Sequence, residues 1–386
     1  MKALRQLTLL LVLILGQSLA HAQSDRYQSV TLPTTYESVE VRPIGGKEVR
    51  NVVLMIGDGM SLSHIATLWT ANGGRINLSN AQATGLVITT ARDQLITDSA
   101  AAATAMSTGR KANYHTLAVD TLGHPLVTIV DIANRAGLGT GVVSTCRLYD
   151  ATPAAFLAHN KDRDALYEII AQFPESNCDL IMGGGAHAFE KRPDGRDIFM
   201  EMEQAGYRVT RSLEEFAALG DDATEKSLCV YAEKDVPEPL ERGDLLPDAA
   251  VLALNHLQKH SPEGFFLMIE GSQLDDYGHT NDLDLLMQET ADFDRTVGEV
   301  MKWAEQDGET LVIVLADHET GGLTLVGGDL ERGEVQGHFS TGSHSGTIVP
   351  AYLYGPAAEY FTGIYHNTEI YRKIMRLLGL SEHCSN

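Results

Sequence analysis

The chain has 386 residues, with 29 basic and 52 acidic side chains and a formal net charge of −23. Such an acidic balance argues against a dedicated role in binding nucleic acid, and against attraction of anionic substrates by the field of the whole protein. Any positive potential that an anion needs must therefore come from local groups.

Residues 1–22 have the pattern of a secretory signal. Lys2 and Arg5 give a basic start, residues 7–15 an apolar core, and Ala20-His21-Ala22 a cleavage site. The apolar run is too short to span a membrane. We therefore expect cleavage near Ala22 and an exported protein, periplasmic or secreted, with no membrane partner.

Three continuous apolar runs predict buried strands, at residues 51–56, 265–269 and 311–315. Runs of this length, separated by helical patterns, indicate a parallel sheet that is covered on both faces. Acidic residues follow the three runs: Asp58, Glu270, and Asp317 with His318. Ligands bind outside the carboxyl ends of such strands, so we expect these side chains to meet at one edge of the sheet.

An alanine-rich helix is predicted to begin at or near Ser99. Thr97-Asp98-Ser99 precedes an alanine run to Met106, and Gly109 is a natural stop. The free N–H groups and the positive dipole end at a helix N-terminus favour an anion. Ser99 is therefore placed to meet a phosphate, although by itself it could be a simple helix cap.

Further candidate ligands lie outside the three strand ends. Asp275 and His279 are four residues apart, so on a helical turn they share a face. His344 is predicted to lie in a small polar loop. The whole segment from Gly322 to His344 is also predicted to be only a short loop. Like charges gathered at one edge repel one another unless a cation holds them, and mixed N and O ligands suit zinc.

The other apolar patterns complete one α/β domain. Strands are predicted at residues 141–146, 179–182 and 349–354, and helices at residues 166–173, 249–260, 283–305 and 368–378. The length would permit two domains, but the candidate ligands run from residue 58 to residue 344, so the chain must close on itself. We expect an extended N-terminal arm over residues 23–48 and a single domain over residues 49–386.

Four cysteines are present, and none lies in a CxxC motif or in a candidate metal site. Four cysteines allow three full pairings. Cys146 is expected to be a free core thiol. A disulfide between Cys178 and Cys229 is our expectation for the others, with Cys384 unassigned.

Six motifs, in this order, resemble the alkaline phosphatase family. They are Asp58-Gly59-Met60, Thr97-Asp98-Ser99-Ala100, Asp150-Ala151-Thr152-Pro153-Ala154, Glu270-Gly271-Ser272, Ala316-Asp317-His318-Glu319-Thr320-Gly321-Gly322 and Gly342-Ser343-His344. Each motif alone is weak, but six in register are specific. The resemblance implies a central, mostly parallel sheet between helices, a homodimer, and hydrolysis of small phosphate monoesters through a phosphoserine intermediate at two zinc ions and one magnesium ion.

The resemblance also assigns roles to residues. Ser99 matches the nucleophile, Arg163 the arginine that clamps two phosphate oxygens, and Asp150 an acid beside the magnesium and its waters. The implied metal ligands are Asp275, His279 and His344 at one zinc; Asp317, His318 and Asp58 at the second; and Asp58, Thr152 and Glu270 at the magnesium.

One position departs from the family pattern. Relatives generally carry a basic or aromatic residue after the aspartate that matches Asp275, and this residue touches the phosphate. Here it is Asp276, which would repel phosphate or accept a hydrogen bond from a metal-bound water. A side chain that only points into solvent is the alternative.

Two other functions remain open from the sequence. The first is a phosphodiesterase or sulfatase of the same wider superfamily, in which the nucleophile is usually a threonine or a modified cysteine or serine. The second is an exported zinc- or phosphate-binding protein without turnover. Ser99, together with Thr152, Glu270 and Arg163, favours the monoesterase over both.

Overall fold

The computed structural model describes residues 27–220 and 226–381. The predicted signal at residues 1–22 and Cys384 lie outside the described residues. In the described part of the chain, ten strands form one large sheet. Their order is β15 (Gly363–His366), β3 (Ala83–Ile88), β14 (Val349–Tyr354), β9 (Thr310–Leu315), β2 (Asn51–Gly57), β8 (Phe265–Gly271), β4 (Gly139–Arg147), β5 (Leu180–Gly184), β7 (Ser227–Val230) and β6 (Arg208–Thr210).

The sheet is mostly parallel, because only β14 runs antiparallel to its neighbours β3 and β9. Every residue of β2, β8 and β9 is buried. Strands that are buried on both faces need a layer of helices on each side. The predicted α/β class with a central, mostly parallel sheet is therefore confirmed.

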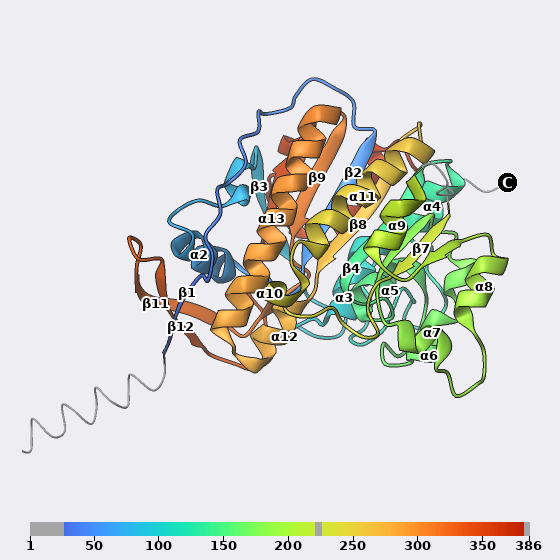
Figure 1. Ribbon diagram of the computed structural model, residues 1–386, viewed down its shortest axis with the longest axis horizontal. Helices are drawn as coiled ribbons and strands as arrows, with labels where there is room; N and C mark the ends of the chain where they lie inside the picture. Colours follow the sequence, from blue (N-terminus) through green and yellow to red (C-terminus); the bar gives the residue numbers. More distant parts are fainter. Residues whose placement is uncertain (1–26, 221–225, 382–386) are drawn as a thin grey trace, which may run out of the picture.

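Two groups of helices cover the sheet. Long helices α11 (Leu245–His260) and α13 (Leu283–Asp307) lie across the face that is nearer to the viewer in Figure 1, and they pack on β2, β4, β8 and β9. Helices α3 (Ser99–Thr108), α4 (Ile129–Arg135), α5 (Ala151–Leu157) and α14 (Thr368–Leu377) form the second layer, in which α4 and α5 contact β4 and β8. The remaining helices are α2 (Leu62–Ala71), α6 (Leu166–Ile170), α7 (Ala186–Glu190), α8 (Ile198–Gln204), α9 (Leu213–Leu219), α10 (Pro239–Arg242) and α12 (Gln273–Thr280).

The segment between Gly322 and His344 is not the short loop that the sequence predicts. It contains β11 (Leu323–Asp329) and β12 (Glu334–Phe339), which pair antiparallel, and β1 (Gln28–Thr31) adds a third strand beside β12 (Figure 1). Gly327, Gly328 and Asp329 give β11 a composition that is poor in strand formers, which hides the hairpin in the sequence. Two short strands, β10 (Glu319–Thr320) and β13 (His344–Ser345), also pair, so His344 is held in a strand and not in a loop.

The segment after β1 crosses the outer layer without regular structure. Tyr36 donates its hydroxyl to Asp294 Oδ2 at 2.6 Å, and Arg42 Nε lies 2.8 Å from Glu305 Oε1. Both acidic partners are on α13, so this segment covers the helix that in turn covers the sheet. No helix in the described part of the chain combines the length and the apolar character needed to cross a membrane.

The expected disulfide between Cys178 and Cys229 is wrong. Both are free and buried, as is Cys146, which matches the expectation for that thiol. In the pairing of β5 with β7, Cys229 lies opposite Met182, four residues beyond Cys178. Four residues of extended chain span roughly 13 Å, which is far more than a disulfide allows.

Candidate active site

The site lies where three neighbouring parallel strands end. Glu270 is in β8 opposite Ile56 of β2, and Ile56 also lies opposite Leu315 of β9. Asp58 follows β2 and Asp317 follows β9, so the three acidic residues reach the same edge of the sheet. The structure thus brings together the residues that the sequence places after the three apolar runs.

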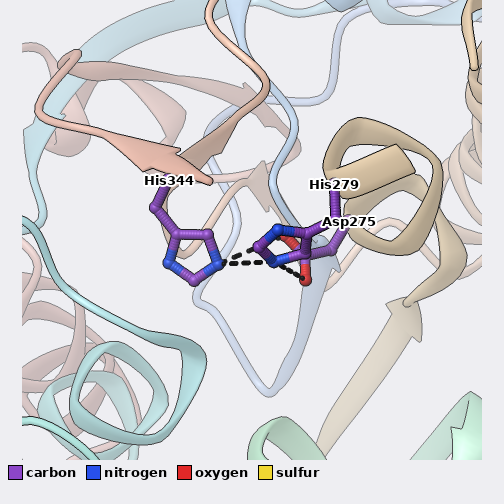
Figure 2. Close-up of side chains that lie close together, drawn as sticks. All are labelled: Asp275, His279 and His344. Atoms are coloured by element: carbon purple, nitrogen blue, oxygen red, sulfur yellow. Dashed lines mark hydrogen bonds and ion pairs between the residues drawn. The ribbon is translucent and has the colours of Figure 1, made fainter. Parts of the chain in front are cut away.

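The first cluster consists of Asp275, His279 and His344 (Figure 2). His279 Nε2 lies 3.1 Å from His344 Nε2 and 3.3 Å from Asp275 Oδ2, and His344 Nε2 lies 3.5 Å from Asp275 Oδ1. Asp275 and His279 share one face of α12, and β13 delivers His344 from the other side. Two imidazole nitrogens and a carboxylate therefore converge on one point.

Backbone carbonyls fix the protonation of both histidine rings in this cluster. Nδ1 of His279 lies 3.0 Å from the carbonyl oxygen of Gly342, and Nδ1 of His344 lies 2.8 Å from that of Thr97. A carbonyl only accepts, so each Nδ1 must carry the proton. In the neutral ring Nε2 then holds a free lone pair, as a metal ligand requires.

The second cluster consists of Asp58, Asp317 and His318, all buried. His318 Nε2 lies 3.2 Å from Asp317 Oδ2 and 3.4 Å from Asp58 Oδ1. Ser99 Oγ lies 3.2 Å from the same nitrogen. The serine hydroxyl is therefore part of the same buried group as the second cluster.

Helix α3 sets the position of Ser99. Asp98, not Ser99, is the helix cap: its Oδ1 accepts from the N–H of Ala101 at 3.1 Å. Ser99 is the first helical residue, so its hydroxyl lies at the end where N–H groups and the dipole favour an anion. The helix ends at Gly109 in the left-handed conformation, with φ 69°.

Thr320 links the two clusters, and sequence reasoning missed this role. Its hydroxyl donates to Asp275 Oδ1 and lies 3.2 Å from His318 Nδ1. Because the hydroxyl proton goes to Asp275, the hydroxyl oxygen accepts from Nδ1–H of His318, which leaves Nε2 of that ring free. The rings of His318 and His344 also stack, with centroids 3.6 Å apart. The signal in the sequence is that Thr320 belongs to the Ala316–Gly322 motif, two residues after His318.

The third set, Asp58, Thr152 and Glu270, contains only oxygen ligands. Thr152 Oγ1 donates to Asp58 Oδ2 at 3.5 Å. Glu270 Oε2 accepts from the hydroxyl of Ser144 at 2.5 Å and from the thiol of Cys146 at 3.4 Å. Sequence reasoning missed these two partners, which orient Glu270 from β4.

Arg163 is held by carboxylates on both sides. One terminal nitrogen donates to Asp98 Oδ2 and the other to Asp150 Oδ1, each at 3.1 Å. Arg147 also donates to Asp150, at 2.7 Å. A guanidinium carries five N–H donors, so Arg163 keeps donors for an anion. Through Asp98, the arginine is tied to the same helix end that carries Ser99.

Asp276 is exposed on the first turn of α12. Desolvation by the surrounding protein raises its pKa to about 6, and the carboxylates of Asp275, Asp150 and Asp235 add to this rise. Asp276 is therefore within electrostatic reach of Asp150 and Arg147, and it adds negative charge to the rim of the site.

The electrostatics of the buried carboxylates favour a bound cation. Burial raises the pKa of Asp58 well above its usual range, and the charges of Asp317, Asp275 and Glu270 raise it further. Burial also raises the pKa of Glu270 to about 8. Burial lowers the pKa of His318, which keeps that ring neutral. Without a cation, these carboxylates cannot all ionise together.

Two buried oxygens of the second cluster test whether these residues fit a metal ion. Asp58 Oδ1 and Asp317 Oδ2 are buried and have no hydrogen-bond partner. Both lie within 3.4 Å of His318 Nε2, whose lone pair could also bind a metal. Unsatisfied buried acceptors are costly, and a cation in their midst would satisfy both oxygens. The donor set therefore fits a divalent metal.

The chain resembles known proteins over most of its length. The alkaline phosphatase family model matches residues 49–336. Alkaline phosphatase 4 of Bacillus subtilis is 34% identical over 296 residues, which cover 72% of this chain and 63% of that relative. The solved alkaline phosphatase from the Antarctic bacterium TAB5 is 35% identical and superposes with a TM-score of 0.82, covering 89% of this chain and 100% of that one. A histidine-to-glutamate mutant of the TAB5 protein, solved with Mg bound, matches equally well.

Proposed function

The chain belongs to the alkaline phosphatase family, and from this premise we propose that it hydrolyses phosphate monoesters to an alcohol and inorganic phosphate. The observation that carries the proposal is the position of Ser99 Oγ, at a helix N-terminus and 3.2 Å from His318 Nε2. A nucleophile, an anion-binding helix end and a convergent set of metal ligands are thus found in one place.

The proposed cations follow from the donor sets. The Asp275–His279–His344 and Asp58–Asp317–His318 clusters mix nitrogen and oxygen ligands, which zinc prefers. The oxygen-only set of Asp58, Thr152 and Glu270 suits magnesium. When bound, these cations would neutralise the phosphate and favour ionisation of the Ser99 hydroxyl.

The proposed reaction consists of two displacements at phosphorus, in which the side chains have separate roles. Arg163 holds two phosphoryl oxygens with its planar fork, and the N–H groups at the start of α3 face the developing charge. Ser99 Oγ attacks phosphorus and gives up its proton, the ester P–O bond breaks, and the leaving alkoxide gains one proton to become the alcohol. Water then attacks the phosphoserine, the Ser99 Oγ–P bond breaks, one proton of the water restores the Ser99 hydroxyl, and inorganic phosphate leaves.

Arg163 also favours monoesters over diesters. The terminal phosphoryl group of a monoester has three oxygens besides the ester oxygen, so Arg163 can hold two of them while the third stays free for a cation. In a diester the second substituent takes the place of that third oxygen. Rates on aryl phosphate monoesters should therefore exceed rates on matched diesters, and the opposite order would favour a phosphodiesterase.

Metal analysis with a phosphatase assay tests the proposal. The purified protein should contain zinc and magnesium, lose activity on chelation, and regain it when both metals return. Ser99→Ala should abolish turnover but keep the metals, whereas Ser107→Ala, at the other end of α3, should leave turnover intact. Activity that resists chelation, or an active Ser99→Ala variant, would contradict the proposal.

Assembly and location are also proposed. We infer a homodimer, supported by exposed apolar side chains around a hollow at the edge of the sheet, Leu62, Leu86 and Ile364. Light scattering of the purified protein tests this. Export to the periplasm or the medium is inferred from the signal pattern, and N-terminal sequencing of the mature protein should begin after Ala22.

A further inference from the structure

His115 lies in the loop that joins α3 to α4, and its backbone forms hydrogen bonds with Arg163 and with Asp98, the carboxylate that binds Arg163. Its N–H donates to Asp98 Oδ1 at 3.2 Å, and its carbonyl accepts from the N–H of Arg163 at 3.1 Å. Asp98 is also the side chain that accepts from the Arg163 guanidinium. The main chain of His115 thus bridges the arginine and its carboxylate partner.

The imidazole of His115 reaches the two neighbours of Arg163 in the chain. Nε2 lies 3.2 Å from Asp164 Oδ2 and 3.4 Å from Asp162 Oδ1. On the other side of the ring, Nδ1 lies 3.9 Å from Asp98 Oδ2. The ring therefore sits among three carboxylates, two of which flank Arg163 directly.

Those flanking carboxylates have little else to restrain them. The side chains of Asp162 and Asp164 are 61% and 77% exposed. Local contacts shape the turn, since Asp162 Oδ1 accepts from the N–H of Asp164 at 2.9 Å, and two backbone hydrogen bonds between Leu117 and Asn160 hold the residues just before it. The ring of His115 adds a long-range contact to the two carboxylates themselves, from 47 residues before Asp162 in the chain.

His115 holds this position in an unfavourable conformation. Its φ is 70°, in the left-handed region that costs a residue with a Cβ roughly 1–3 kcal/mol. Such a conformation persists only where surrounding contacts hold it. Here those contacts are the two backbone hydrogen bonds and the ring interactions with Asp162 and Asp164.

We propose that His115 is a positioning residue for Arg163: its ring clasps Asp162 and Asp164, and this fixes the arginine between Asp98 and Asp150. The inference rests on the proposed function, in which Arg163 binds the phosphoryl group. Without the clasp, the 162–164 turn shifts more freely and the guanidinium spends less time aligned for an anion. Binding of phosphate then weakens, while the attack by Ser99 on a phosphate already bound changes little.

The variant His115→Gly tests the clasp with little disturbance of the backbone. Glycine adopts a φ of 70° readily, so the hydrogen bonds to Asp98 and Arg163 remain possible and only the ring is lost. We expect KM for an aryl phosphate and Kd for inorganic phosphate to rise about 5-fold, as for loss of a partly exposed charged contact, with kcat within about 2-fold of the starting protein. Thermal unfolding measured alongside should show an unchanged or higher midpoint.

A second background and a matched control complete the experiment. In an Arg163→Ala protein, His115→Gly should cause no further rise, because the clasp acts only through the arginine. His124→Ala removes another exposed histidine–aspartate pair, in which Nδ1 lies 3.1 Å from Asp120 Oδ2, and should leave both constants unchanged.

Other outcomes would overturn the inference: no rise in Kd, an equal rise in the Arg163→Ala background, a fall in kcat at unchanged KM, or the same rise in His124→Ala. The phosphate Kd needs no turnover. If the starting protein fails to hydrolyse a monoester, the proposed function falls, and the Kd series still decides the role of His115.

Discussion

The hydroxyl of Thr320 should control metal affinity, and Thr320→Val isolates it. The hydroxyl donates to Asp275 Oδ1 and accepts from His318 Nδ1, so it orients one proposed ligand in each of two clusters. Valine keeps the branched shape of threonine but leaves both partners without their hydrogen bond. Since Thr320 is fully buried, water cannot replace the lost hydroxyl.

The expected loss of zinc affinity in Thr320→Val follows from the type of hydrogen bond that is removed. A hydrogen bond to a charged group contributes about 1.5–3 kcal/mol, and a loss of about 2 kcal/mol corresponds to roughly 30-fold in an equilibrium constant. This lies within the 10–100-fold range usual for residues that orient metal ligands. We therefore expect zinc to bind about 30-fold more weakly to Thr320→Val.

Competition with a chromophoric chelator measures this affinity directly. Thr320→Ser is the matched control, because it keeps the hydroxyl and removes only a methyl group, and it should stay within about 3-fold of the starting protein. A Thr320→Val protein that binds zinc as tightly as the starting protein would refute the argument that this hydroxyl orients Asp275 and His318.

Three further predictions concern other parts of the molecule. Asp276→Lys should replace repulsion by attraction at the rim of the site and tighten inhibition by inorganic phosphate; unchanged inhibition would show that Asp276 does not act on the bound anion. Gly109→Ala should destabilise the protein by about 2 kcal/mol or more, measured by urea unfolding, because the new Cβ would lie 2.4 Å from Tyr371 Cδ1 at a φ of 69°; an unchanged midpoint would refute the close packing at the end of α3. Burial lowers the pKa of His64 to about 4, and Nδ1 accepts from the N–H of Ser61 at 2.7 Å. The folded-state pKa of His64 lies below the usual 6.5, so between pH 6.5 and pH 4 the unfolded chain binds a proton that the folded chain does not. The free energy of unfolding should therefore fall by about 3 kcal/mol as the pH falls from 6.5 to 4. His64→Gln, which can still accept from Ser61, should lack this component, so equal acid losses in both proteins would contradict it.

The strand ends were predictable from the sequence because they depend on local pattern and on one rule of topology. The apolar runs ending near residues 56, 269 and 315 are long enough to predict strands by themselves. Parallel pairing of these strands then brings Asp58, Glu270 and Asp317 to one edge of the sheet. Helix α3 was equally accessible, since alanine propensity and Gly109 define its ends. The assignment of metals and of a nucleophile to these residues came from the family resemblance and stays a proposal.

The features that the sequence did not predict depend on contacts between distant segments. The β11–β12 hairpin carries glycines that conceal its strands, and its partner β1 lies some 300 residues away in the chain. Pairing Cys178 with Cys229 failed because strand register, which sets their separation, has no local signal. The bond from Ser144 to Glu270 and the contacts of His115 with Asp162 and Asp164 likewise arise only once the chain has folded.

The proposed ligands also have a consequence for how the chain matures. They are drawn from five regions, from the end of β2 to β13, so no fragment of the chain can assemble the pocket. A cation that binds only this finished arrangement adds its binding energy to the global fold, about 4 kcal/mol when its free concentration is a thousand times its Kd. Phosphatase turnover would thus report the completion of folding, and the supply of metal would set how long each folded molecule resists unfolding and proteolysis.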